Sequence, residues 1–323
     1  MLRSDLEEQV TEGTRRKLVA LERVCGPIIG KYRAAPGVTD IHRNEDGGVW
    51  LEQYGEDIDT GEFMPEAESR RLIQLVADID GETIHDGEVN ANLPTGERFS
   101  ALIPDRGPSS FSIRQPFGER ITLADYEESG ILGCEKARAI REAIRQELSL
   151  LIIGPTGSGK TTFANGILAE PPYPSRRLFV IQEQKELVPT GRNIVYGRIG
   201  TLSDQRLVKH SLRRAPRSII YGELRDKIAF DYGKAVMSGH KGLTTIHSSS
   251  GMGGLIRMEQ LFVEAGIPPA IAREYVLLAV DFVIVIQKIE EGGQRVRRVT
   301  EAGPVRRELD AMGRYQIDAV SEK

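Results

Sequence analysis

The chain of 323 residues has little cysteine, few aromatic residues and no long apolar run. Its two cysteines, Cys25 and Cys134, lie far apart, which excludes a disulfide scaffold and a zinc site built on paired cysteines. We expect both to be reduced, buried thiols. The longest apolar stretch, residues 276–286, is short and contains Asp281, whereas a membrane-spanning helix needs roughly 18 or more apolar residues.

The chain also has no excess of basic over acidic residues. The net charge of -4 argues against a protein that coats DNA, although it allows a local basic patch. Residues 1–17 are charged throughout and lack the apolar core of a secretory signal. With 40% hydrophobic and 28% charged residues, the composition is that of a globular protein. We therefore expect a cytoplasmic protein, at most peripheral to a membrane.

The length predicts about two domains. Residues 1–114 form an α+β domain by pattern, with a helix over 5–24, a second helix from about residue 65, and strands at 38–41, 49–54, 99–103 and 111–114. Residues 115–133 contain Pro116 and three glycines and are the expected linker, in which Thr122 and Asp125 resemble a helix-capping pair.

The pattern of residues 134–323 is different. A polar helix over 135–148 is followed by apolar strands at 150–153, 178–181, 218–221, 243–246 and 282–286, most of them separated by helical segments. Alternating helices and fully apolar strands are typical of a parallel sheet that is covered on both faces. The predicted fold class is therefore α/β, with a smaller α+β domain in front of it.

The first of these apolar strands runs directly into the pattern G-x-x-x-x-G-K-[ST], which is a phosphate-binding loop. Its glycines let successive N–H groups face phosphate oxygens, and the following helix adds its positive N-terminal end. Lys160 is the expected ligand of the β- and γ-phosphates, and the Thr161 hydroxyl the expected ligand of Mg²⁺. The candidate nucleotide-binding residues are Gly154, Pro155, Thr156, Gly157, Ser158, Gly159, Lys160, Thr161 and Thr162.

Acidic residues follow two other apolar strands. Ligands of open α/β sheets bind at the carboxyl ends of the strands, so we expect Glu223 beside the phosphate loop, acting on Mg²⁺ through water or orienting the attacking water. Glu183 is a second candidate, and a surface acid is the alternative for each. His247 and His240 bracket another strand and suggest a sensor of bound phosphate rather than a metal site, with histidines that only pack as the alternative.

Three arginines, Arg213, Arg214 and Arg217, stand just before the strand that leads to Glu223. Either these arginines lie on a solvated face of the domain, or they contact a phosphate or a neighbouring subunit. The sequence alone leaves these alternatives open.

Four elements in this order resemble the secretion ATPase superfamily, and within it the TrbB-type ATPases of conjugative transfer. The elements are a Walker A loop, an acidic "Asp box", a Walker B strand ending in Gly-Glu and a "His box", here at residues 154–161, 182–186, 219–223 and 239–247. The Asp box departs from the family pattern, because Gln182 stands where an acid is usual.

The resemblance implies a RecA-like ATPase domain that uses ATP and Mg²⁺, with Glu223, Glu183 and His247 as catalytic residues. It also implies a homohexameric ring in which Arg98 and Arg114 of the N-terminal domain approach the nucleotide. The implied function is the ATP-driven motor of a type IV secretion or conjugative transfer machine. Its implied partners are inner-membrane and coupling components, without stable direct binding of nucleic acid.

Two alternatives remain at this stage. One is a sibling motor of pilus retraction or type II secretion. The other is a RecA-like DNA-binding module in which the nucleotide acts only as a switch.

Overall fold

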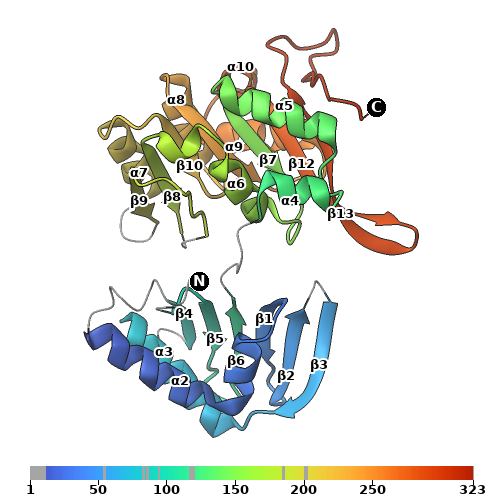
Figure 1. Ribbon diagram of the computed structural model, residues 1–323. Helices are drawn as coiled ribbons and strands as arrows, with labels where there is room; N and C mark the ends of the chain where they lie inside the picture. Colours follow the sequence, from blue (N-terminus) through green and yellow to red (C-terminus); the bar gives the residue numbers. More distant parts are fainter. Residues whose placement is uncertain are drawn as a thin grey trace. The chain divides into compact units, whose positions relative to one another are not determined.

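The computed structural model describes residues 12–53, 56–81, 84, 87–93, 95–115, 121–183, 186–199 and 203–322. The chain divides into two compact units, residues 1–118 and 119–323. Each unit is described by itself (Figure 1).

The first unit is an antiparallel sheet with two helices packed against it (Figure 1). The strand order is β3-β2-β1-β6-β5-β4. Buried residues alternate along β5 and β6, as expected when one face of a sheet is covered. The elements are α2 (Glu12–Arg33), β1 (Val38–Arg43), β2 (Gly48–Gln53), β3 (Glu56–Phe63), α3 (Glu66–Asp80), β4 (Glu88–Asn92), β5 (Arg98–Leu102) and β6 (Ser110–Arg114).

The second unit is a seven-stranded sheet in the order β13-β12-β7-β11-β10-β8-β9. All neighbouring strands are parallel except β13, which pairs antiparallel with β12. The strands are β7 (Leu150–Ile153), β8 (Leu178–Gln182), β9 (Ile194–Arg198), β10 (Ser218–Tyr221), β11 (Lys241–Ile246), β12 (Phe282–Glu291) and β13 (Gln294–Pro304). The predicted α/β class, with a preceding α+β unit, is confirmed.

Helices cover both faces of this sheet (Figure 1). They are α4 (Leu123–Glu128), α5 (Cys134–Arg145), α6 (Lys160–Ala169), α7 (Asp204–Leu212), α8 (Ile228–Met237), α9 (Gly251–Glu264) and α10 (Pro269–Ala279), with a 3₁₀ turn at Tyr173–Ser175. Alternate residues of one strand enter different cores: Leu150 and Ile152 pack with α4, α5 and α6, whereas Leu151 and Ile153 pack with α7 to α10. This explains why β7 is apolar at every position.

Several local predictions can be compared with the structure. The predicted capping pair is present, because the Thr122 side chain accepts from the Asp125 N–H and Asp125 accepts from the Thr122 N–H. Helix α4 lies within the segment predicted as a linker. The predicted first helix is described from Glu12 onward and continues to Arg33 with an interruption at Gly26, whose φ is 62°. Its predicted first residues, 5–11, lie outside the described residues.

The prediction of two buried thiols was wrong for one of them. Cys25 is buried, but Cys134 is exposed. It is the first residue of α5, after Gly133, and the apolar side of that helix is formed by other residues such as Ala137 and Ile140. None of the described helices is long and apolar enough to cross a membrane.

Candidate nucleotide-binding site

The loop between β7 and α6 has the conformation that its sequence predicts. Gly157 and Gly159 take positive φ angles of 69° and 93°, which other residues rarely adopt. Gly154 is confined: a methyl group in place of one of its hydrogens would lie 2.2 Å from the Ile286 carbonyl oxygen and 2.5 Å from Ser158 Oγ. Helix α6 begins at Lys160, so its first N–H groups have no partner within the helix and face the loop.

Lys160 is buried at the base of this loop. Its ammonium donates to the carbonyl oxygens of Gly154 (2.8 Å) and Pro155 (3.0 Å), and it lies 3.1 Å from His247 Nδ1. Burial lowers the pKa of Lys160 to about 8, although the Glu223 carboxylate opposes this shift. An anionic phosphate at the loop would favour the charged form of this lysine.

His247 and Glu223 meet next to Lys160. Strands β11 and β10 are neighbours, and each residue follows the end of its strand. His247 Nε2 lies 2.6 Å from Glu223 Oε1, and the second carboxylate oxygen accepts a hydrogen bond from Arg225 (2.7 Å). Burial and the charge of Lys160 lower the pKa of His247, which favours neutral imidazole at pH 7.

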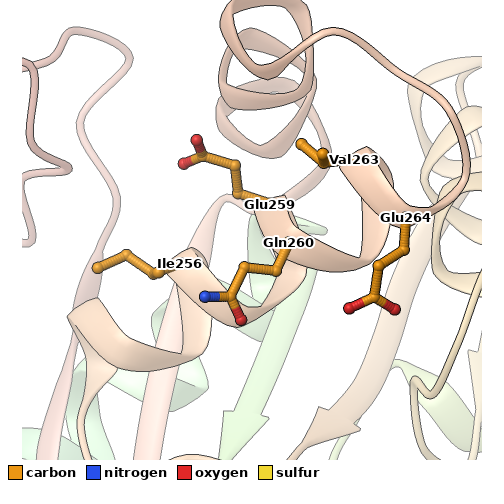
Figure 2. A pocket seen from close by; sticks show the side chains of 5 residues that line it. All are labelled: Ile256, Glu259, Gln260, Val263 and Glu264. Carbon is orange, nitrogen blue, oxygen red and sulfur yellow. The ribbon is translucent and has the colours of Figure 1, made fainter.

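A hollow of about 280 Å³ opens at this group of side chains. Its lining includes Glu223, Arg225 and His247. A larger hollow of about 390 Å³ lies on α9 and is lined by Ile256, Glu259, Gln260, Val263 and Glu264 (Figure 2). None of the predicted site residues lines that second hollow.

Glu183 is exposed at the end of β8, close enough to Arg225 to contribute to the raised pKa of that arginine. Its neighbour Gln182 is buried and holds the chain that follows β8. The Gln182 amide donates to the Leu187 carbonyl (3.1 Å) and accepts from the N–H groups of Glu186 (3.0 Å) and Leu187 (2.7 Å). The residue that departs from the family pattern therefore has a structural task.

Two contacts at this edge of the sheet were missed by the sequence analysis. Arg225 forms an ion pair with Glu223. The only indication of this contact in the sequence was that Arg225 stands two residues after Glu223. Asn165 of α6 donates to the Glu186 carbonyl (2.8 Å) and accepts from the Val188 N–H (2.8 Å), so it also fixes the segment after β8. Nothing in the residue spacing pointed to Asn165.

Several sequence candidates do not join this site. His240 precedes β11, at the opposite end of that strand from His247, and hydrogen-bonds the Pro216 carbonyl (2.9 Å). Arg213, Arg214 and Arg217 likewise precede β10, at the amino-terminal edge of the parallel strands, whereas the loop follows their carboxyl edge. These arginines therefore lie at the opposite edge from the phosphate loop of the same chain, and contact with a neighbouring subunit stays a prediction.

Arg98 and Arg114 belong to the first unit. They stand opposite each other on the antiparallel pair β5–β6, and Arg114 forms an ion pair with Asp40 (2.8 Å). Among the described residues, no group of three or more His, Cys, Asp or Glu side chains is arranged to hold a metal ion by itself.

The strand, loop and helix at the carboxyl edge of a mainly parallel sheet define the second unit as a P-loop nucleotide-binding domain. A family model described as "Type II/IV secretion system protein" matches residues 75–302. The chain belongs to this family of secretion ATPases.

Known relatives agree with this assignment. The chain is 33% identical to a probable conjugal transfer protein TrbB of Sinorhizobium fredii, over 87% of each chain. It is 30% identical to the type IV secretion system protein PtlH of Bordetella pertussis, over 64% of this chain and 71% of that protein. The protein is thus a homologue of type IV secretion and conjugal transfer ATPases.

Solved structures share the fold. The pilus retraction motor PilT with bound ADP has a TM-score of 0.63 at 20% identity, over 86% of this chain and 80% of that chain. The ATPase DotB of Legionella pneumophila has a TM-score of 0.62 at 19% identity, over 88% and 78%.

Proposed function

We propose that this chain is the ATP-hydrolysing motor of a type IV secretion or conjugative DNA transfer machine, in which hydrolysis drives domain motion within a ring. The observation that carries the proposal is the contact chain Lys160–His247–Glu223. It connects the lysine of the phosphate loop to the acid that follows the neighbouring strand.

This geometry supports the following roles for the side chains. Lys160 exchanges its contacts with loop carbonyls for the β- and γ-phosphates of ATP. Glu223 orients the attacking water, and His247, between the two, responds to the γ-phosphate. Glu183, which is exposed and farther along the edge, has a lesser role. These assignments rest on proximity to Lys160 and on the chemistry of each group.

The donors at this edge suit Mg²⁺. The Thr161 hydroxyl and the Glu223 carboxylate are oxygen ligands, which this cation prefers. The described residues contain no cluster that would hold a metal alone, and Mg²⁺ at nucleotide sites is held largely by phosphates and water. Thr161 would ligate the ion directly and Glu223 through water. The ion would neutralise phosphate charge.

The remaining parts of the proposal rest on the family. Its members include conjugal transfer and type IV secretion proteins, which supports a hexamer that works with inner-membrane and coupling components and lies peripherally at that membrane. Arg98 and Arg114 would approach the nucleotide in such an assembly. The likeness to the PilT structure shows a shared fold. Because ATPases of this fold include a pilus retraction motor, that activity is the second candidate function.

The first test is Lys160→Ala. We expect it to abolish ATP turnover and sharply weaken binding of ADP and of a non-hydrolysable ATP analogue in calorimetric titration, because it removes the cation at the base of the loop. Lys209→Ala, an exposed lysine of α7, is the control. Unchanged affinity of Lys160→Ala for both nucleotides would contradict the proposal.

A further inference from the structure

Arg297 of β13 lies against the phosphate loop from the side. A methyl group in place of a hydrogen of Gly159 would lie 3.1 Å from Arg297 Nε and 3.4 Å from its Cζ. Strand β13 pairs with β12, and the β12 residue Ile286 directs its carbonyl at Gly154. The β12–β13 hairpin therefore forms one wall of the loop, and Arg297 brings a guanidinium to it.

This guanidinium has no anionic partner within the described part of the chain. Its Nε is buried and makes no hydrogen bond. The next residue, Arg298, is paired with Glu291 at 2.6 Å. The Arg297 side chain as a whole is half-buried, but its buried Nε–H lacks an acceptor. A buried donor of a charged group without a partner is costly, so the position of this N–H is explained if an anion accepts from it.

The order of the strands shows which part of a nucleotide Arg297 would meet. Along the carboxyl edge, β10, β11, β7 and β12 follow one another, and β13 is the next strand. Glu223 follows β10 and His247 follows β11, so the γ-phosphate end of the nucleotide would lie toward them. The opposite end of the phosphate chain points toward β12 and β13, where Arg297 stands.

Contacts of the loop agree with this direction. Lys160 Nζ faces His247, on the β11 side of the loop. Arg297 is instead near Tyr126 of α4, whose pKa burial raises to about 12 while the positive charge of Arg297 opposes the rise. The two cations thus lie on different flanks of the loop.

We propose that the Arg297 guanidinium binds the α-phosphate of the nucleoside di- or triphosphate held by the loop. The proposal rests on the proposed nucleotide-binding function and names a ligand within the same site. A guanidinium suits this task because its planar set of donors matches two phosphate oxygens and stays charged at any physiological pH.

The test is calorimetric binding of ADP and of a non-hydrolysable ATP analogue to Arg297→Ala. Because the α-phosphate is common to both, we expect both affinities to fall by a similar factor, about ten- to a hundredfold. Arg297→Lys keeps the charge but loses the fork, and should recover part of the affinity.

Arg298→Ala is the matched control, since it removes a neighbouring arginine whose carboxylate partner is already present. ADP affinity of Arg297→Ala within twofold of wild type, even with a lowered melting temperature, would make Arg297 a packing residue and overturn the inference alone. A wild-type chain that binds no ADP would overturn the proposed function with it.

Discussion

At the scale of single residues, the site is a line of alternating charges. The cations Lys160 and Arg225 stand on either side of Glu223, with His247 between Lys160 and the acid. The neutral imidazole of His247 lies between the Lys160 ammonium and the Glu223 carboxylate. A single substitution removes the contact that each of these groups makes. The contribution of each to ATP turnover can therefore be measured separately.

The sharpest substitution is Glu223→Gln, which keeps the shape and removes the charge. If Glu223 positions the attacking water, we expect the hydrolysis rate to fall by roughly 10²–10⁴. Binding of Mg-ATP should change far less, because Lys160 and the loop N–H groups still hold the phosphates. Single-turnover hydrolysis at saturating ATP measures the rate.

Glu183→Gln is the control for that experiment. Glu183 is exposed and does not contact His247 or Lys160 in the described structure, so we expect a smaller loss of rate. A Glu223→Gln rate within threefold of wild type, beside a collapsed Glu183→Gln rate, would assign the catalytic carboxylate to β8.

The lowered pKa of Lys160 makes nucleotide affinity depend on pH. Burial places that pKa at about 8, so the lysine is mostly charged at pH 7 and mostly neutral at pH 9. Phosphate binding requires the charged form, and we therefore expect ADP affinity to fall as pH rises through about 8. Titrations at pH 7, 8 and 9 check this, and equal affinities at all three would contradict the pKa shift.

At the scale of elements, the segment after β8 depends on Gln182. Its amide both donates to and accepts from backbone groups of the loop, which an ionised carboxylate cannot do. Gln182→Glu, which introduces the acid usual in the family, should lower the free energy of unfolding by about 1–3 kcal/mol. Urea denaturation measures this, with Glu183→Gln as the exposed control.

An unchanged unfolding midpoint for Gln182→Glu would mean that the Gln182 hydrogen bonds are replaceable, for example by water. The comparison with Glu183→Gln separates the loss of these hydrogen bonds from a general effect of changing charge at this edge of the sheet.

The elements that the sequence predicted best are those with one dominant signal. Strands β7 and β10 were predicted at their observed ends because both faces are buried and every residue is apolar. Strands β3, β4, β9 and β13 were missed. Strand β13 carries four charged residues in its eleven, and β3 is exposed along most of its length, so pairing with a neighbour rather than hydrophobic pattern decides their conformation.

At the scale of the whole molecule, the sequence predicted an α+β unit followed by an α/β unit with a parallel sheet. The order of the strands and motifs also predicted the sheet edge at which Glu223 and His247 lie near Lys160. It could not predict the antiparallel hairpin β12–β13, and so it could not bring Arg297 to the loop. The loop motif is local in sequence, whereas the wall beside it comes from a strand more than a hundred residues later, and only tertiary pairing joins them.

The amino-terminal edge of the second sheet carries a charge that the net value of -4 hides. Cations stand before or at the start of each strand from β8 to β11: Arg177, Arg192, Arg213, Arg214, Arg217 and Lys241. Two of them, Arg217 and Lys241, are paired with Glu147 and Asp281. We expect such an edge to retain nucleic acid at low ionic strength without any specific site, and the retention to fall steeply with added salt. DNA captured on a filter in dilute buffer would thus be background from this edge, and only capture that persists at physiological ionic strength, where screening acts within about 8 Å, would favour a DNA-binding switch.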